Sequence, residues 1–329
     1  METAIVILNW NGKKWLKAFL PSLLKYSEQA DIYVIDNAST DDDVEFLTTN
    51  FPSVKIVQNA QNYGFAGGYN EGLKHISADL FCLLNSDVEV SEGWLPPVLY
   101  LFNQDETLAA VQPKILDYNQ KDQFEYAGAA GGFLDNLGYP FCRGRIFWTL
   151  EKDQHQYNDV LPIFWASGAC LFIRSEVFWK VGGFDADFFA HMEEIDLCWR
   201  LQNLGYKILY CGHSTVYHVG GGTLQKNSPR KTYLNFRNSL FMLIKNLPLY
   251  KVFPVIFARL VLDGITAIVF WRYEGFAHLK AIFFAHMDFY KKFGHFWKKR
   301  QKTQRKFWAK RLVPFQYFIL GKKYMKDLF

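Results

Sequence analysis

The sequence lacks the cysteine spacing that zinc sites and disulfide frameworks require. Its five cysteines are widely separated, and no Cys-x-x-Cys pair occurs among the 329 residues. Structural zinc sites usually contain such pairs, and small secreted proteins rely on a dense set of paired cysteines. We therefore expect reduced thiols and a cytoplasmic location.

The N-terminus lacks the basic stretch and apolar run of a secretory signal peptide. The chain instead passes directly into Ala4–Leu8, whose apolar and β-branched residues are typical of a first strand. This pattern argues against secretion.

The chain also lacks a window of about 18 uncharged apolar residues, which a conventional transmembrane helix would need. The best candidate is the segment 252–271, and Arg259 and Asp263 interrupt it. At a spacing of four residues these two charges can pair on one helical face. We expect an interfacial or re-entrant amphipathic helix here, with a helix of a soluble subdomain as the alternative.

Acidic residues are nearly absent from the C-terminal tail. Residues 289–329 contain thirteen Lys or Arg and one acid, Asp327, although the whole chain has a net charge of only +5. Nucleic acid would satisfy this charge, but the rest of the chain has no recognition motif for it. Interleaved aromatic residues suit a lipid headgroup region; they are Phe293, Phe296, Trp297, Phe307 and Trp308. We therefore predict an anionic membrane surface as a partner.

Short apolar segments and segments of helical period alternate over residues 4–114. Half of all residues are hydrophobic, which is enough for a sizeable core. The alternation predicts an α/β fold with a mostly parallel sheet covered by helices on both faces. The expected strands are 5–10, 32–35, 54–57, 80–84 and 109–111, and the expected helices are 15–24 and 94–102.

Residues 115–160 have no clear pattern; they are either loops that contact the acceptor or a variable surface excursion. A second ordered block follows them. Beyond this block a glycine-rich linker and a helical C-terminal region are expected. The expected elements are a strand at 169–173, a helix at 193–204, a strand at 206–211 and the linker at 220–229. We predict a catalytic domain over 1–222, with a donor half at about 1–114 and an acceptor half at about 160–222, and a helical region over 223–329.

Polar residues follow two of the expected strands. Asp36 ends the second strand, and Asn85, Ser86 and Asp87 follow the most apolar one. Ligands of open α/β sheets bind beyond the carboxyl ends of strands, where a carboxylate can hold Mg²⁺ or Mn²⁺ on phosphates. Each segment taken singly is also a typical turn or helix cap.

Two further segments have residues of chemical interest. Three glycines, Gly64, Gly67 and Gly68, precede an expected helix and would allow close approach of the backbone to a ligand. Glu193 and Glu194 begin another helix, where the helix dipole favours acids and would keep a carboxylate ionised. An ionised carboxylate there can act as a general base toward an acceptor hydroxyl.

Taken in order, these motifs resemble family 2 glycosyltransferases, in particular a rhamnosyltransferase-like branch with the nucleotide-diphospho-sugar transferase (GT-A) fold. The resemblance spans roughly residues 1–246. The motifs that carry it are 9–12, 36–41, 64–72, 84–87, 167–169, 182–185, 193–200, His218, and Tyr233 with Arg237-Asn238.

The resemblance implies a role for each motif. Asp87 would bind Mg²⁺ or Mn²⁺, and His218 would complete the metal site or touch the diphosphate. Glu194, with Glu193 beside it, stands where the family has its Glu-Asp pair and inherits the role of base. Asp36 would bind the pyrimidine. The other implied donor contacts are Asn9, Asn37, Ser39, Asn62, Gly64, Asn85 and Ser86, and weaker contacts to acceptor or diphosphate are Trp165 and Arg237.

The implied activity is inverting transfer of a sugar from a UDP- or dTDP-sugar to a hydroxyl of a glycan or lipid-linked acceptor in cell-surface polysaccharide synthesis, at the inner face of the cell membrane. The Gln-x-x-Arg-Trp signature of processive synthases is absent after the base, which favours one addition per encounter. The alternatives are a sugar-nucleotide pyrophosphorylase and a non-catalytic, membrane-bound glycan-binding subunit. Nothing in the sequence excludes an oligomer.

Overall fold

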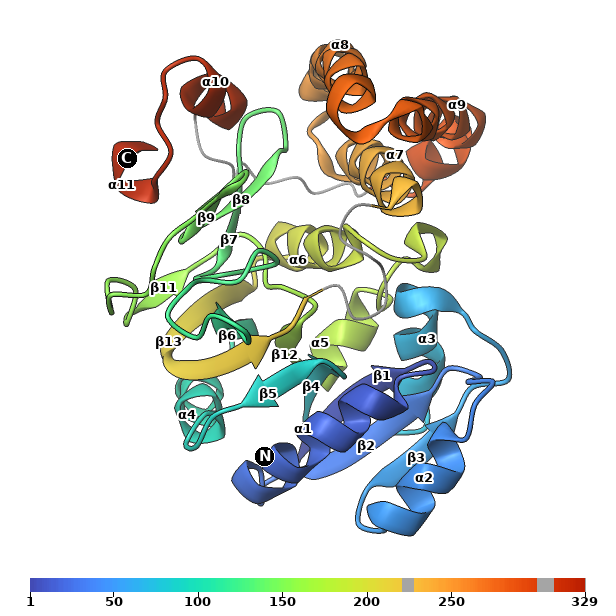
Figure 1. Cartoon of the computed structure of the whole chain (residues 1–329), viewed down its shortest axis with the longest axis vertical. Helices are drawn as coiled ribbons and strands as arrows, with labels where there is room; N and C mark the ends of the chain where they lie inside the picture. The colour runs from blue at the N-terminus through green and yellow to red at the C-terminus, as the bar shows by residue number, and fades with distance from the viewer. Residues whose placement is uncertain (221–227, 301–310, 329) are drawn as a thin grey trace.

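A nine-stranded mixed sheet forms the centre of the molecule (Figure 1). The computed structural model describes residues 1–220, 228–300 and 311–328. The strand order is β11-β13-β6-β12-β4-β1-β2-β3, and β5 pairs with β13. The strands are β1 (Thr3–Asn9), β2 (Asp31–Asp36), β3 (Lys55–Gln58), β4 (Leu80–Asn85), β5 (Val88–Val90), β6 (Leu108–Asp117), β11 (Val160–Pro162), β12 (Cys170–Arg174) and β13 (Lys207–His218).

The N-terminal half of the sheet is parallel, as the alternating pattern predicts. Strands β1 to β4 run parallel, whereas β12 is antiparallel to both β4 and β6. Strand β6 continues well beyond the predicted 109–111, because its polar residues are buried with partners. The Gln112 side chain donates to the carbonyl of Gly128 at 3.1 Å, and Lys114 pairs with Asp153 at 2.8 Å.

Helices cover both faces of the sheet. Alternate residues of β1 point to opposite sides, so that Ile5 and Ile7 join one hydrophobic cluster with α1 and α4, while Ala4 and Val6 join another with α3, α5 and α6. The covering elements are α1 (Lys13–Tyr26), α2 (Asp43–Asn50), α3 (Gly64–Leu73), α4 (Leu95–Gln104), α5 (Ser175–Lys180), the 3-10 turn η1 (Ala186–Phe188) and α6 (Glu193–Asn203).

The segment without a clear sequence pattern contains a second sheet. Four short antiparallel strands in the order β10-β9-β8-β7 lie within residues 132–150. They are β7 (Gly132–Leu134), β8 (Pro140–Cys142), β9 (Arg145–Ile146) and β10 (Thr149–Leu150). Strands of two or three residues are too short to show a period of two, and for this reason they could not be predicted from the sequence.

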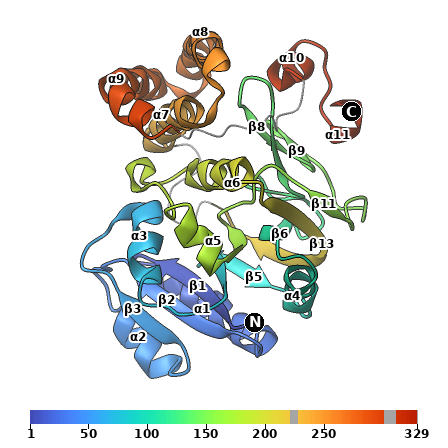
Figure 2. The same ribbon diagram turned by 180° about the vertical axis from the view of Figure 1, so that it is seen from behind.

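The C-terminal region is helical and lies at the end of the molecule opposite α1 and α2 (Figures 1 and 2). Its elements are α7 (Pro229–Asn246), α8 (Leu249–Glu274), α9 (Phe276–Lys298), α10 (Val313–Phe318) and α11 (Met325–Leu328). Most of the predicted linker, and Phe307 and Trp308, lie outside the described residues. The predicted domain boundary at 222/223 stays a prediction. Leu240–Ile244 of α7, which follow this boundary, share a hydrophobic cluster with the sheet.

Helix α8 is longer than the sequence analysis allowed. It has 26 residues, and an 18-residue window within it has a mean hydropathy of 2.0; within the described ranges it is the one helix long and apolar enough to cross a membrane. The expectation that this segment fails on length is therefore wrong, because charges that face inward do not interrupt a helix. The predicted pairing of its charges is confirmed, with Arg259 Nε 3.7 Å from Asp263 Oδ1.

A buried cluster of charges joins α7 to the rest of the molecule. Lys245 is 2% exposed, and its Nζ lies 2.9 Å from Asp196 and 2.8 Å from Asp185. Asp196 also accepts from Arg200 at 2.8 Å and from Asn246 at 2.8 Å. The third acid of the Glu193–Asp196 group is thus structural, and the charge of Lys245 holds the pKa of the fully buried Asp196 below its ordinary value despite burial.

We expect Lys245→Met to lower the free energy of unfolding by about 3 kcal/mol, because it leaves two carboxylates short of a buried partner. Urea denaturation followed by circular dichroism measures this change. Lys17→Met, at an exposed position of α1, is the matched control and should change stability by less than about 0.5 kcal/mol. Equal stability of the two variants would show that the cluster does not join α7 to the sheet.

Candidate active site

Three of the predicted donor residues lie at one edge of the sheet. Asn9 is the register partner of Asp36 on β2, and Leu8 is the partner of Asn85 on β4. Because β1, β2 and β4 are parallel neighbours, their carboxyl ends place Asn9, Asp36 and Asn85 side by side. This is the edge at which open α/β sheets bind ligands.

The turn after β2 is tied to the turn after β1. The Asp36 carboxylate, 5% exposed, accepts from the backbone of Ser39 at 3.3 Å. The Ser39 hydroxyl in turn accepts from the backbone of Asn11 at 3.0 Å. Asp36, the residue predicted to bind the pyrimidine, is therefore held in a fixed orientation by a local turn.

A buried carboxylate that sequence reasoning missed supports this edge. Asp43 is fully buried, and its Oδ2 accepts from the Asn9 side chain at 2.6 Å and from the Gly12 backbone at 2.9 Å. A Cβ on Gly12 would lie 2.3 Å from the Asn9 side-chain oxygen, so that only glycine fits there. In the sequence, Asp43 is the last of three consecutive aspartates and looks like an ordinary helix start.

The glycine-rich segment does not form the expected ligand-facing loop. Gly64 begins α3, and a Cβ there would lie 2.5 Å from the ring of Phe189 and 2.8 Å from its carbonyl. Within the helix, Gly68 packs against Asn37 and Gly72 against Ile35. The glycines are needed because α3 approaches the strands and the segment before α6 so closely. Contact of Gly64 with a donor stays a prediction.

Two predicted donor residues belong to one amide network. Asn37 is 2% exposed; its Nδ2 donates to Asn62 at 3.1 Å and to the Gly64 carbonyl at 3.1 Å, and its oxygen accepts from Asn59 at 3.0 Å. Asn62 also accepts from the Gly64 backbone at 2.9 Å. Both ends of Asn37 have protein partners, which position α3. A direct contact of Asn37 with a donor stays a prediction.

Strand pairing brings Asp87 and His218 together. His218 ends β13 opposite Val88 of β5, and the Asp87 Oδ1 lies 3.1 Å from His218 Nε2. Asn85 Nδ2 lies 3.5 Å from the same nitrogen. Ser86 lies between Asn85 and Asp87 in the turn from β4 to β5, next to Gly12. The predicted metal residues, which are 131 positions apart, thus form one contact.

Glu125 completes this cluster and was not predicted. Its Oε2 lies 3.4 Å from His218 Nδ1, and it is 3% exposed. It comes from residues 115–160, where the sequence shows no pattern that could have identified it. Burial lowers the pKa of His218, but the charges of Glu125 and Asp87 outweigh burial and raise it to about 10. The two carboxylates therefore favour positive charge at this place.

The predicted base lies at the start of α6, after a segment with unusual backbone geometry. Phe189, His191 and Met192 all have φ between 65° and 72°, the left-handed region that is costly for residues other than glycine. Within the described part of the chain, Nε2 of His191 and one oxygen each of Glu193 and Glu194 are buried without a hydrogen-bond partner. A cluster of unsatisfied polar atoms on a strained segment is typical of a functional site.

Burial distinguishes the two glutamates. Glu193 is 4% exposed, and burial together with repulsion from Glu194 raises its pKa well above the ordinary value. Glu194 is partly exposed, and burial raises its pKa to about 7. The expectation that the helix terminus keeps Glu194 fully ionised is therefore wrong, since desolvation outweighs the backbone hydrogen bonds.

Helix α7 holds the segment before Glu193. Asn238 is fully buried, and its Nδ2 lies 2.8 to 2.9 Å from the carbonyls of Phe188, Ala190 and His191. Arg237 donates to the Phe188 carbonyl at 3.2 Å. On the other side, the Phe189 carbonyl accepts from the first backbone amides of α3, at 2.8 Å and 3.2 Å. We call residues 187–192 the base loop.

The two weaker predicted contacts have protein partners instead. Arg237 also donates to the Tyr233 hydroxyl at 3.1 Å and to Asn238 at 2.9 Å, which occupies its guanidinium. Trp165 is 4% exposed, and its Nε1 donates to the Phe133 carbonyl at 3.0 Å. Their surroundings do not support direct contact with acceptor or diphosphate.

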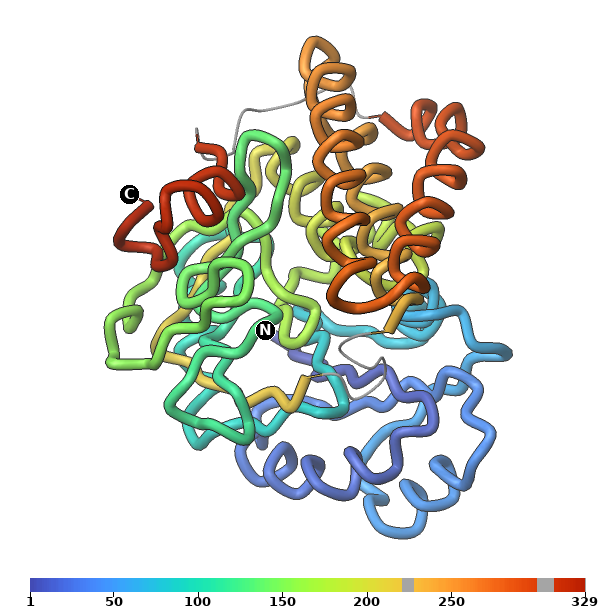
Figure 3. Tube along the Cα trace, turned by 45° about the horizontal axis from the view of Figure 1, so that its top comes forward, coloured from blue at the N-terminus to red at the C-terminus, as the bar shows by residue number. Residues whose placement is uncertain are grey.

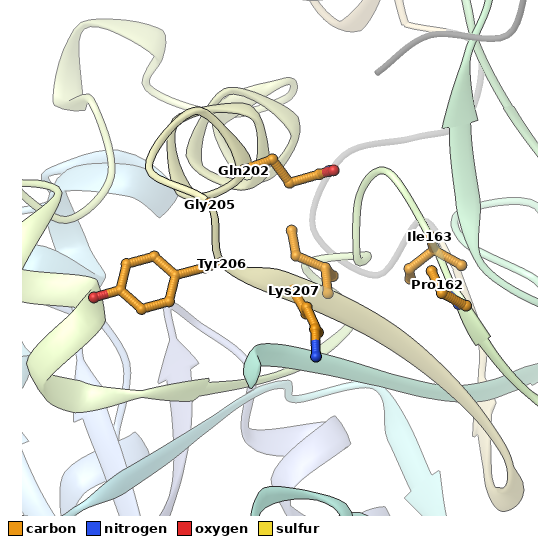
Figure 4. Close-up of a pocket in the computed structure, with 7 residues that line it drawn as sticks. Pro162, Ile163, Gln202, Gly205, Tyr206 and Lys207 are labelled. Carbon is orange, nitrogen blue, oxygen red and sulfur yellow. The ribbon is translucent and has the colours of Figure 1, made fainter. Parts of the chain in front are cut away.

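A cavity of about 220 Å³ lies elsewhere, between the end of α6 and the edge strand β11 (Figure 4). Its lining includes Gln202, Tyr206 and Lys207. Lys207 begins β13, whereas His218 ends it. The cavity is therefore at the opposite end of this strand from the Asp87–His218 contact and contains none of the predicted site residues.

Comparison with known proteins agrees with this geometry. The N-acetylglucosaminyl-diphospho-decaprenol L-rhamnosyltransferase of Mycobacterium tuberculosis is 26% identical over 233 residues, covering 65% of this chain and 75% of that protein. The low-salt glycan biosynthesis hexosyltransferase Agl10 of Haloferax volcanii is 22% identical, covering 72% and 74%. The crystal structure of GalNAc-T7 with UDP, GalNAc and Mn²⁺ superposes with a TM-score of 0.58 at 17% identity, covering 76% of this chain and 49% of that one.

The structural likeness identifies the fold as GT-A, as the sequence resemblance implied. A family model described as Glycosyl transferase family 2 matches residues 4–182, more than half of the chain. The chain therefore belongs to glycosyl transferase family 2 and is a glycosyltransferase.

Proposed function

We propose that this enzyme transfers a sugar, with inversion, from a UDP- or dTDP-sugar to a hydroxyl group of a lipid-linked or glycan acceptor in cell-surface polysaccharide synthesis. The observation that carries this proposal is the contact of Asp87 with His218 beside the strand ends of Asp36 and Asn85. A pair of residues that favours positive charge, next to an edge of polar strand ends, suits a nucleoside diphosphate.

The donor is assigned to the edge formed by β1, β2 and β4. Asp36 keeps its carboxylate in a turn where it can accept from a pyrimidine N–H, and Asn9 and Ser39 fix that turn. Asn85 and Ser86 lie between this edge and Asp87. The GalNAc-T7 structure contains UDP with Mn²⁺, which supports a nucleoside diphosphate and a divalent ion on the same fold.

The residues around Asp87 fit a divalent cation that is also bound by phosphates. Among the described residues, no group of three His, Cys, Asp or Glu side chains could hold a metal by itself. Mg²⁺ and Mn²⁺ sites that bind nucleotides commonly use one or two protein ligands and complete their coordination with phosphate oxygens and water. Asp87 and His218 would be those ligands. His218 would have to release the proton that its raised pKa otherwise retains at neutral pH. The ion would stabilise negative charge on the leaving diphosphate.

Glu194 is the proposed general base. With a pKa of about 7 it can take the proton from the acceptor hydroxyl. The hydroxyl oxygen then attacks the anomeric carbon while the bond to the diphosphate oxygen breaks, and the nucleoside diphosphate leaves. A single displacement inverts the anomeric configuration. Glu193 is buried beside Glu194, and burial raises its pKa well above the ordinary value; it would support Glu194.

The proposed acceptor is lipid-linked. The mycobacterial relative is named for a decaprenol-diphosphate acceptor, and an acceptor of that kind lies in a membrane. We therefore assign the enzyme to the cytoplasmic face of the cell membrane as a peripheral protein, with the C-terminal region against anionic lipid.

The two alternatives are less well supported. Family membership and the transferase relatives favour sugar transfer over synthesis of a nucleotide sugar by a pyrophosphorylase. A non-catalytic subunit would have no reason to keep strained backbone and unsatisfied carboxylates next to each other at the base loop.

The metal assignment is tested by binding. With UDP or dTDP at about a hundred times its dissociation constant in the presence of Mn²⁺, the wild-type enzyme should be stabilised by about 2.7 kcal/mol. Asp87→Ala should lose the part of this stabilisation that depends on Mn²⁺, and the exposed control Asp122→Ala should keep it. Thermal unfolding with and without Mn²⁺ measures the difference. An unchanged Mn²⁺ effect in Asp87→Ala would remove Asp87 from the metal site.

The base assignment is tested by turnover and its pH dependence. Glu194→Gln should bind nucleotide normally and lose most turnover, about 100-fold or more. In the wild type, turnover should rise as pH increases through about 7, because only the ionised Glu194 accepts a proton. The variant should lack this rise, and the exposed control Glu92→Gln should retain it. Release of nucleoside diphosphate in the presence of lipid-linked acceptors is the readout; a rise that persists in Glu194→Gln would exclude Glu194 as the base.

A further inference from the structure

Helix α8 has an outer face without charge. Over residues 252–271, all of which the structure describes, the only charged side chains are Arg259 and Asp263, and both are buried. Five exposed apolar residues follow a spacing of three or four, which places them on one stripe of the helix. They are Phe253 (61% exposed), Phe257 (71%), Val261 (50%), Ile265 (55%) and Ile268 (63%), and we call them the α8 ridge.

The two charges of α8 face the inside of the molecule. Arg259 donates to the Ser239 hydroxyl at 2.9 Å and to the Leu137 carbonyl at 3.2 Å, and its guanidinium lies 3.9 Å from the Tyr139 ring centroid. Asp263 has His286 as a further partner at 3.4 Å. A surface helix in water has the reverse arrangement, with charges outward and apolar residues inward. The alternative of a soluble helical subdomain therefore does not explain this helix.

The ends of the ridge have the residues typical of a membrane interface. Trp271 and Tyr273 are 54% and 80% exposed at one end, with Arg272 between them, and Tyr250 is 62% exposed at the other. Trp and Tyr side chains collect where acyl chains meet headgroups. On the neighbouring helix α9, aromatic and basic residues are exposed together; they are Phe276, Lys280, Phe283, Phe284, Tyr290, Lys291 and Lys292. Such basic residues favour anionic lipid.

The contacts of α8 argue for an orientation in the plane of the membrane. Arg259 and Asp263 lie near the middle of the helix and contact residues 137–139 of the body. If α8 crossed the bilayer, these contacts would carry part of the catalytic body into the hydrocarbon, which is costly for its polar groups. Helix α8 also runs beside α9 over much of its length (Figure 3).

We propose that the α8 ridge, together with the exposed aromatic residues of α9, inserts into one leaflet of an anionic membrane with α8 parallel to the surface. This rests on the proposed membrane partner and deepens it, because it assigns the insertion to α8 and α9 and gives the basic tail only an electrostatic contribution. The same helical bundle contacts the base loop, since His295 of α9 and Lys299, directly after this helix, pair with Asp187. Insertion therefore fixes the active site at the membrane, where a lipid-linked acceptor is found.

Vesicle flotation of the full-length enzyme tests the proposal, with vesicles of phosphatidylcholine and phosphatidylglycerol. The double variant Phe257→Asp/Ile265→Asp should partition into the vesicles about tenfold less than the wild type or weaker still, at both low and high salt. The control Tyr100→Asp/Val160→Asp changes two exposed apolar residues on other elements and should bind as the wild type does. The tail variant Lys323→Glu/Lys326→Glu should weaken binding only at low salt.

Three results of the flotation assay would each overturn the proposal: wild-type protein that does not bind the vesicles, a ridge variant that binds like the wild type, or loss of binding in the tail variant alone at all salt concentrations. A wild-type dimer that the ridge variant converts to a monomer, without a change in vesicle binding, would assign the ridge to a second copy and also overturn it. The ridge variant should keep its Mn²⁺-dependent stabilisation by UDP or dTDP. A wild-type enzyme that binds vesicles but is not stabilised by UDP or dTDP with Mn²⁺ would contradict the proposed transfer from a UDP- or dTDP-sugar. The proposal that the α8 ridge binds a membrane would then still hold.

Discussion

The active site depends on one buried amide, the side chain of Asn238. It reaches three carbonyls of the base loop, at 2.8 to 2.9 Å, and satisfies a backbone that three non-glycine residues hold in the left-handed region. The loop is also held by the first amides of α3, which in turn contacts Asn37 beside Asp36. The edge formed by β1, β2 and β4 and the base loop are therefore parts of one continuous network of contacts. Asn238 contributes the contacts from α7.

This network explains why the helical region belongs with the sheet. The family match ends at residue 182, before the base loop, yet α7 supplies both Asn238 and the Lys245 that pairs with Asp185 and Asp196. The same bundle presents the α8 ridge on its outer side. The proposed function therefore assigns three roles to α7, α8 and α9: support of the proposed base, stability of the body and the proposed attachment to a membrane.

The sequence predicted the parts of the site that follow from strand periodicity. Apolar strands end at Asn9, Asp36 and Asn85, and parallel pairing brings such ends together. It could not predict Glu125, which lies among strands too short to show a pattern, or Asp43, which looks like a helix start. The pKa of Glu194 also escaped prediction, because it depends on burial by residues distant in sequence. The inward-facing charges of α8 misled the analysis of its length, since their partners, residues 137–139 and Ser239, come from other segments.

The most direct test of this account compares two substitutions on one helix. Asn238→Ala should lower turnover by about tenfold or more, since the base loop loses its fixed orientation, while the affinity for UDP or dTDP with Mn²⁺ stays within about twofold. Asn246→Ala removes an equally buried asparagine of α7 that contacts Asp196 and Met242 rather than the base loop; it should lower stability and leave the turnover of the folded enzyme unchanged. Wild-type turnover in Asn238→Ala, or an equal loss in both variants, would contradict the account.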